Sequence, residues 1–289
     1  MPRLLLLLLS CLSLLAAACG GPSEATSSGG PRVIAAFYPL AFVAQEIAGE
    51  SASVANLSPP GVEPHDLELA PDQVRALSEA DLVVYLGAGF QPAVEDIVGE
   101  LEETATLDAL DAQGDLLEDD PHVWLDPRRL GEIADAVAAR LAEVDPDDAR
   151  TYDDNAAALN EKLGGLDEDY AAALKNCERD ELVVSHEAFG YLTDRYGLEQ
   201  VGVSGIDPES EPSPGRLAEV AEFVRDNGVT TIFFEAQVSP AIAEVLAEES
   251  GATTEVLDPL EFPPDDSTDY VDVMKNNLAA ITTALGCSP

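Results

Sequence analysis

From residue 31 onward, short apolar runs typical of strands alternate with segments whose apolar residues recur every three or four positions, as in helices. Several helical segments begin at a proline, as at Pro71, Pro92 and Pro240, or end at a glycine, as at Gly228. This alternation predicts an α/β fold in which parallel sheets are flanked by helices. The strand-like runs cover 32–37, 53–57 and 81–86 in the first part of the chain, and 181–185, 198–204, 229–234 and 253–257 in the second.

The middle of the chain has a different pattern, because helical spacing continues from 128 to 174 without a strand-like run. Asp145-Pro146 interrupts this pattern once. We therefore predict two α/β lobes joined by one long connecting helix. Gly164-Gly165 lies inside that helix and predicts a kink, because each glycine costs about 1 kcal/mol relative to alanine. The predicted boundaries are 32–145 for the N-terminal lobe, 146–176 for the connecting helix and 177–289 for the C-terminal lobe.

The N-terminus has the pattern of a secretory signal, with Arg3, an apolar stretch and small residues before Cys19. We assign 1–18 to this signal, because its apolar stretch is shorter than the roughly 20 residues that span a bilayer. The small residues before Cys19 resemble a bacterial lipobox, which predicts lipidation of Cys19 and a Gly- and Ser-rich tether over 19–31. We expect an extracytoplasmic protein, lipid-anchored to the bacterial cell membrane at the cell surface or in the periplasm. The alternative is a plain cleaved signal and a soluble product.

Charge and cysteine content narrow the functional classes. Lys and Arg number 14 against 56 Asp and Glu, which gives a formal net charge of −42. Such a chain repels phosphate backbones and anionic lipid surfaces, so we expect no nucleic-acid binding and no attachment through a basic patch. Cys177 and Cys287 remain in the mature chain, and in an oxidising compartment such a pair predicts a disulfide between the start of the second lobe and the last helix.

The chain contains three histidines, His65, His122 and His186, and each lies in a predicted loop. His65 and His186 follow predicted strands, and parallel α/β sheets bind ligands beyond the carboxyl ends of their strands. The gaps between the histidines are far too wide for a local metal motif. On these facts alone, three unrelated surface or capping histidines remain an alternative.

The residues around the histidines form a set of motifs in a fixed order. Together the motifs resemble the zinc and manganese substrate-binding lipoproteins of ABC importers, the ZnuA/TroA/PsaA-like family of cluster A-I solute-binding proteins. The resemblance runs from about Val33 to the end of the chain, and it depends on all four motifs together. They are Glu-Pro-His-Asp at 63–66, Pro-His-Val-Trp-Leu-Asp-Pro at 121–127, Ser-His-Glu-Ala-Phe-Gly-Tyr at 185–191 and Val-Leu-Asp-Pro-Leu at 256–260.

The resemblance implies a metal between the lobes, held by the residues that match the family's ligands: His65, His122, His186 and Asp258. Three imidazoles and one carboxylate suit Zn²⁺, whereas Mn²⁺ prefers more oxygen ligands. The implied function is capture of Zn²⁺, with Mn²⁺ as the alternative, and its delivery to an ABC permease and its ATPase. We expect a monomer that is not an enzyme.

Three further acids are candidates for orienting the ligating imidazoles, because such histidines usually donate their other N–H to a carboxylate or carbonyl. They are Glu235, Glu187 and Asp126. Glu235 is also the best alternative carboxylate ligand, and packing between the lobes is the other role open to it. Helix capping or turn formation is the alternative for Glu187 and Asp126.

One departure from the family pattern concerns the stretch 111–121, where many zinc-specific relatives carry a long His-rich loop. Here the stretch is short and acidic, and it is interpreted as a solvated loop or as a weak attractor of cations.

Two other functional classes remain open. One is a metal-dependent hydrolase with a His₃ zinc site and an open fourth position, in which Glu235 or Asp258 acts as base. The other is a surface adhesin with a structural metal.

Overall fold

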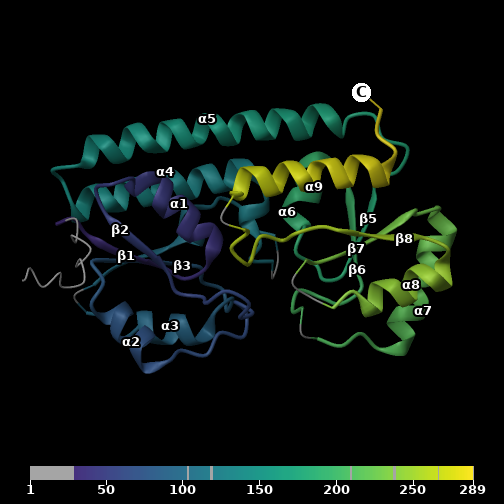
Figure 1. Cartoon of the computed structure of the whole chain (residues 1–289), viewed down its shortest axis with the longest axis horizontal. Coiled ribbons are helices and arrows are strands. Elements are labelled where there is room, and N and C mark those ends of the chain that lie inside the picture. Colours follow the sequence, from purple (N-terminus) through teal and green to yellow (C-terminus); the bar gives the residue numbers. More distant parts are fainter. Residues whose placement is uncertain are drawn as a thin grey trace, which may run out of the picture.

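The computed structural model describes residues 29–102, 104–117, 120–208, 210–236, 239–265 and 267–288. It contains two α/β halves side by side, with one long helix running along both of them (Figure 1). The predicted fold class is therefore confirmed. The predicted signal, the lipidation site Cys19 and the tether up to residue 28 lie outside the described residues.

The N-terminal half is built on a sheet of four parallel strands in the order β2-β1-β3-β4. Helices α1 and α4 lie on one face of this sheet, and α2 and α3 lie on the other (Figure 1). The sequence did not predict β4. The elements are β1 (Arg32–Ala35), α1 (Tyr38–Ala48), β2 (Ser53–Asn56), α2 (Pro71–Ser78), β3 (Leu82–Tyr85), α3 (Pro92–Val98), β4 (Ala105–Asp108), the 3₁₀ helices η1 (Ala109–Ala112) and η2 (Val123–Leu125), and α4 (Pro127–Val144).

The C-terminal half repeats this plan with strands in the order β6-β5-β7-β8, again all parallel. Helix α9 lies on the side of the sheet that faces the long helix, whereas α7 and α8 lie on the opposite side (Figure 1). The elements are β5 (Glu181–Val184), α6 (Gly190–Tyr196), β6 (Glu199–Gly202), α7 (Pro214–Asn227), β7 (Thr231–Phe234), α8 (Ala241–Ser250), β8 (Thr253–Val256) and α9 (Tyr270–Leu285).

The long helix α5 (Ala149–Ala173) continues through Gly164 and Gly165. Its apolar side packs against α1, α4 and α9, so it contacts both halves. Leu163 and Leu166, on either side of the two glycines, are buried at 1% and 2% exposure. Packing of these leucines offsets the low helix propensity of the glycine pair, because most helical stability in proteins comes from burial of an apolar face.

The hydrophobic core is continuous between the two halves. One cluster of buried side chains includes Val33 and Leu40 from the first half, Leu159 from α5 and Met274 from α9. Phe42 stacks on Tyr270 with ring centroids 5.4 Å apart, which joins α1 to α9 directly. The halves are therefore fixed to each other by packing as well as by the chain connection.

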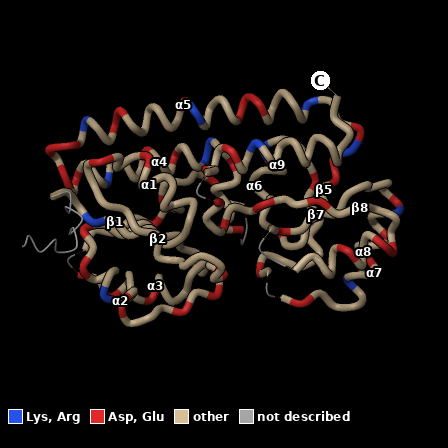
Figure 2. Tube along the Cα trace, viewed as in Figure 1, with Lys and Arg blue, Asp and Glu red and all other residues tan. Residues whose placement is uncertain are grey.

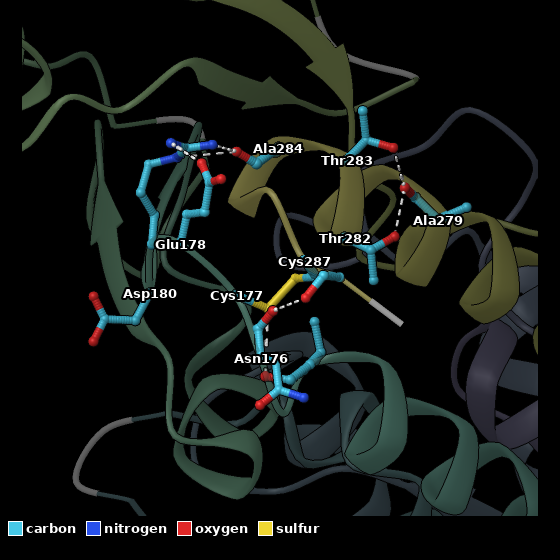
Figure 3. The surroundings of a disulfide bond; sticks show 12 residues. Asn176, Cys177, Glu178, Asp180, Ala279, Thr282, Thr283, Ala284 and Cys287 are labelled. Carbon is cyan, nitrogen blue, oxygen red and sulfur yellow. Dashed lines mark hydrogen bonds and ion pairs between the residues drawn. A yellow bond between two sulfur atoms is a disulfide. The ribbon is translucent and has the colours of Figure 1, made fainter.

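The disulfide predicted between Cys177 and Cys287 is confirmed (Figure 3). It links the segment that follows α5 to the end of α9, across 110 residues of sequence. Hydrogen bonds lie beside it: the amides of Glu178 and Arg179 donate to the carbonyl of Leu285. The bond therefore fastens the last helix to the beginning of the C-terminal half.

Asp and Glu residues are spread along the chain of both halves, and Lys and Arg residues are scattered among them (Figure 2). Among the described helices, none combines the length and the apolarity that a membrane crossing requires.

Candidate metal centre

Four side chains from distant parts of the chain meet between the two halves. They are His65, His122, His186 and Glu261, and one candidate ligand atom from each lies within 4.8 Å of those of the other three. His65 and His122 belong to the N-terminal half, whereas His186 and Glu261 belong to the C-terminal half. The site therefore depends on the relative position of the halves.

Each of the four residues follows a strand, in the loop or turn beyond its carboxyl end. His65 follows β2, His186 follows β5 and Glu261 follows β8. His122 lies beyond β4, immediately before η2. In parallel α/β sheets this edge is where ligands bind, and here the corresponding edges of two sheets supply one cluster.

The distances within the cluster suit a small cation. The Nε2 atoms of His65, His122 and His186 each lie 3.4 Å from Oε1 of Glu261. A tetrahedron with metal–ligand bonds of about 2.0–2.1 Å has edges of roughly 3.3–3.4 Å, so three of its six edges are already present. The side chains are almost fully enclosed: His65 is 12% exposed, His186 is 1% exposed, and His122 and Glu261 are 0% exposed.

Several buried polar atoms of the cluster lack a hydrogen bond within the described residues. They include Nε2 of His122, Nε2 of His186 and Oε2 of Glu261. A buried polar atom without a partner costs free energy, about 1–3 kcal/mol. Coordination of one cation satisfies the two imidazole nitrogens together with the Glu261 carboxylate. The donor set therefore fits a divalent metal ion.

The imidazoles and the carboxylates of the site also shift one another's pKa values. Burial opposes protonation of His186, but its hydrogen bond to Glu235 and the nearby charge of Glu261 outweigh burial and raise its pKa to about 10. Burial likewise opposes protonation of His122, but its hydrogen bond to Asp120 and the nearby charge of Glu261 outweigh burial and raise the pKa of His122. Burial opposes ionisation of Glu261, but the three imidazoles outweigh it and hold its pKa well below the usual value. A bound divalent cation replaces the protons as the positive charge that balances these carboxylates.

Two further carboxylates orient the imidazoles. Oε1 of Glu235 accepts from Nδ1 of His186 at 2.7 Å and from Oγ of Ser185 at 2.6 Å. Oδ1 of Asp120 accepts from the amide of His122 at 2.9 Å and from its Nδ1 at 2.8 Å. A proton on Nδ1 leaves Nε2 with the lone pair, so both imidazoles present a ligand atom toward Glu261.

Aromatic rings support the two histidines of the N-terminal half. Phe90 meets His65 edge to face with ring centroids 4.4 Å apart, and Trp124 lies 5.0 Å from His122. Both aromatic side chains are buried at 1–2% exposure. They restrict the positions of the two imidazoles and contribute apolar surroundings, which strengthens interactions between the site and a cation.

The structure places a carboxylate other than the predicted one beside the three imidazoles. The sequence predicted Asp258, but the residue beside the three imidazoles is Glu261. Asp258 lies three residues before Glu261 in the same loop. Its Oδ1 accepts from the amide of Leu260 at 2.7 Å. Asp258 and Glu261 lie in the same loop after β8, and Glu261 is the one that lies beside the imidazoles.

The other candidate acids have different positions. Glu235 lies against His186, as the sequence predicted for an orienting residue. Asp126 caps α4 by accepting from the amide of Arg128 and pairs with Arg195 at 3.3 Å. The side chain of Glu187 packs against Gly202. The amide of Glu187 donates to the carbonyl of Gly205. The contacts of Asp126 therefore match the alternative interpretation of helix capping.

Sequence reasoning missed Asp120 as an orienting residue and counted it only among the acids of the loop 111–121. The signal was present, because an Asp two residues before a His can accept from that residue's backbone amide in a local turn. It also missed Glu63, whose Oε1 accepts from the amide of His65 at 3.3 Å. Burial, followed by the negative charge of Glu261, raises the pKa of Glu63 to about 8.

A cluster of candidate metal ligands between two parallel α/β halves is typical of the substrate-binding component of an uptake system. Residues 33–284 match the family described as "Zinc-uptake complex component A periplasmic". The chain belongs to this family, which comprises solute-binding transport proteins and not enzymes.

Curated relatives agree with this family. The chain is 34% identical over 306 residues to the zinc-binding lipoprotein AdcA of Streptococcus pneumoniae, covering 97% of this chain and 60% of AdcA. It is 33% identical over 300 residues to the high-affinity zinc uptake system protein ZnuA of Bacillus subtilis, covering 94% of each protein. This chain thus spans about 60% of the length of AdcA and nearly the whole of the Bacillus protein.

Solved structures have the same fold. The Zn(II)-bound ZnuA-like domain of Streptococcus pneumoniae AdcA has a TM-score of 0.78 at 36% identity, covering 89% of this chain and 99% of that one. The laminin-binding protein Lmb of Streptococcus agalactiae, described as a bifunctional protein with adhesin and metal transporting activity, has a TM-score of 0.83 at 33% identity. The match covers 89% of this chain and 100% of Lmb.

Proposed function

We propose that this chain is an extracytoplasmic binding protein that captures Zn²⁺ between its two halves and delivers it to an ABC-type importer. One observation carries the proposal: three imidazole Nε2 atoms, drawn from both halves, surround one oxygen of Glu261 at 3.4 Å. The ligands are His65, His122, His186 and Glu261. The partners are a membrane permease and its ATPase.

The ligand chemistry supports zinc over manganese. Three nitrogen donors and one carboxylate are typical of a tetrahedral zinc site, whereas manganese favours carboxylate, carbonyl and water oxygens. The AdcA domain to which this chain is similar is described as Zn(II)-bound. Zinc is therefore the cargo in our proposal.

The same geometry supports binding over hydrolysis. A catalytic zinc keeps a coordination position open for water or substrate, whereas four protein ligands fill a tetrahedral shell. In our proposal Glu261, whose side chain is fully enclosed, is the fourth ligand and leaves no position open for water. The adhesin activity in the description of Lmb belongs to that protein, and we propose transport for this chain.

Attachment to the membrane by a lipid on Cys19 belongs to the same proposal. Its support is the small residues before Cys19, the Gly- and Ser-rich stretch after it, and the name of AdcA as a lipoprotein. The anchor keeps the binding protein close to its permease, on the outer side of the cell membrane.

The ligand assignment is tested by comparing two carboxylates of one loop. Glu261→Gln removes the charge of the proposed ligand, and we expect zinc affinity to fall on the order of 100-fold or more. Asp258→Asn keeps an oxygen that can accept from the amide of Leu260, so we expect a change below about tenfold. Competition titration against a chromogenic chelator measures both affinities, and His186→Ala is the positive control for ligand loss. Equal losses in the two variants, or a larger loss in Asp258→Asn, would contradict the assignment of Glu261.

The transport role is tested in the source cell. Deletion of the gene should impair growth in zinc-depleted medium, and the full chain should restore it, whereas the Glu261→Gln chain should not. A Cys19→Ser chain should leave the membrane fraction. Unimpaired growth of the deletion strain under zinc limitation, with no second zinc importer in the cell, would refute the transport role.

A further inference from the structure

The loop that carries Glu261 has a backbone conformation that its own residues do not favour. Leu260, immediately before Glu261, has φ of 61°, in the left-handed region that side chains other than those of Gly, Asn and Asp rarely adopt. Its side chain is fully buried. Such a conformation persists only when the surrounding structure holds it, so the contacts of this loop decide where Glu261 lies.

Two sets of hydrogen bonds hold the loop. Within the C-terminal half, the side chain of Asn277 donates to the carbonyl of Asp258 at 2.7 Å and accepts from its amide at 3.0 Å. From the other half, the indole Nε1 of Trp124 donates to the carbonyl of Pro259 at 2.7 Å. Trp124 is two residues after His122, and Pro259 is two residues before Glu261. One hydrogen bond therefore joins two of the ligand loops across the halves.

Trp124 is itself fixed on every side. Tyr270, the first residue of α9, donates its hydroxyl to the carbonyl of Trp124 at 2.6 Å. The indole ring packs against Phe37 at 4.8 Å, Phe90 at 5.4 Å and the imidazole of His122 at 5.0 Å between centroids. The residue is 1% exposed, so its bond to Pro259 is shielded from water.

We propose that Trp124 is a positioning residue that fixes the Glu261 carboxylate against the three imidazoles and thereby favours a four-coordinate cation over a six-coordinate one. This inference rests on the proposed function, because it concerns the selectivity of the same site. A carboxylate on a fixed loop offers one oxygen at a set distance from the imidazoles. A loop released from Trp124 allows Glu261 to move and water to enter, which are the changes that a cation with more oxygen ligands needs.

Trp124→Phe removes the Nε1 donor and keeps an aromatic ring against Phe37, Phe90 and His122. We expect zinc affinity to fall by about 10–100-fold, the usual effect of losing a group that orients a ligand. Manganese affinity should change by less than about threefold, so that the ratio of zinc affinity to manganese affinity falls. With Co²⁺ as a spectroscopic probe, the intense visible absorption of four-coordinate cobalt should weaken in the variant.

A second pair of variants separates positioning from loss of stability. Tyr270→Phe removes the hydroxyl that holds the carbonyl of Trp124, whereas Tyr170→Phe removes an equally buried hydroxyl that donates to the carbonyl of Met274 at 2.6 Å. Both should lower the melting temperature of the metal-free protein, but only Tyr270→Phe should also reduce zinc affinity and the cobalt absorption. This pair provides the test if Trp124→Phe does not fold.

The outcomes are distinct. If folded Trp124→Phe binds zinc and manganese as the unchanged protein does, the positioning role is wrong, and the proposed function stands. The role is also wrong if Tyr270→Phe and Tyr170→Phe have the same zinc affinity. If the unchanged protein does not bind zinc, the proposed function fails before the variants are compared.

Discussion

At the scale of single residues, the site depends on which imidazole nitrogen carries a proton. Glu235 is 4% exposed and accepts from Nδ1 of His186, so it selects the tautomer in which Nε2 is free to bind a cation. Oγ of Ser185 donates to the same oxygen, which restricts the carboxylate further. The arrangement resembles the carboxylate–histidine–metal groups of known zinc sites.

Glu235→Gln should therefore weaken zinc binding without removing a ligand. The amide oxygen can still accept from Nδ1, but the charge that polarises the imidazole is lost, so we expect zinc affinity to fall by about 10–100-fold. Glu244→Gln, at an exposed position on α8, makes the same change in net charge and should leave the affinity unchanged. Isothermal titration with zinc measures both variants. Equal affinities for Glu235→Gln and Glu244→Gln would show that this carboxylate does not act through His186.

The sequence predicted the three histidines of the candidate cluster, but not the carboxylate that the structure places beside them. The chain has three histidines, and each lies inside one of the sequence motifs, so there were few candidate nitrogen ligands. The choice between Asp258 and Glu261 depends on the path of one loop, which turns at Leu260 with φ of 61°. A leucine gives no sequence signal for a left-handed residue, because glycine and asparagine are the usual markers. The loop is held by Trp124 and Asn277, which lie 135 and 19 residues in sequence from their partners in the loop.

At the scale of elements, α5 is joined to both halves by an ionic network around the buried carboxylate of Asp167. Asp167 on α5 accepts from Arg128 of α4 at 2.8 Å and from Arg195 of α6 at 2.5 Å. The hydroxyl of Tyr196 donates to the same carboxylate at 3.1 Å. Burial opposes ionisation of Asp167, but its bonds to Arg195 and Arg128 outweigh burial and lower its pKa to about 2.

This network predicts a pH dependence of stability. Because the pKa of Asp167 is lower in the folded protein than in the unfolded chain, its contribution is present above about pH 4 and is lost as the pH falls toward 2. We expect Asp167 to contribute about 1–2 kcal/mol to the free energy of unfolding, allowing for screening by solvent. Urea denaturation of the metal-free protein at pH 5 and pH 2.5 measures this contribution.

Asp167→Asn should therefore show a smaller loss of stability between the two pH values than the unchanged protein. Asp169→Asn, at an exposed position on the same helix, alters net charge equally and should retain the full loss. The prediction is wrong if the two variants lose the same free energy of unfolding between pH 5 and pH 2.5.

Most elements were predictable because their apolar residues follow the period of a strand or a helix. β4 was missed because all four of its residues are only partly buried, so its segment Ala-Thr-Leu-Asp lacks the apolar run of a central strand. The kink predicted from Gly164-Gly165 assumed that local propensity decides the course of the helix. In the structure α5 continues through the pair, and burial of Leu163 and Leu166 offsets the low helix propensity of the glycines.

At the scale of the whole molecule, the two halves provide complementary parts of one site. Each half contributes two of the four side chains, and the shared core with α5 and α9 sets the separation of the halves. A formal net charge of −42 also gives the protein a negative field that attracts cations over a distance, in addition to the local site. The overall plan could be predicted from the sequence, whereas the relative position of the halves depends on packing between distant segments.

The central claim is that one cation binds between the halves with four protein ligands. It is tested most directly by a crystal structure of the protein purified without added metal, with anomalous diffraction data collected on both sides of the zinc absorption edge. We predict one zinc ion bound by Nε2 of His65, His122 and His186 and by a carboxylate oxygen of Glu261, each at roughly 2.0–2.2 Å. An ion bound elsewhere, a shell that contains Asp258 in place of Glu261, or a six-coordinate manganese at this position would contradict the account.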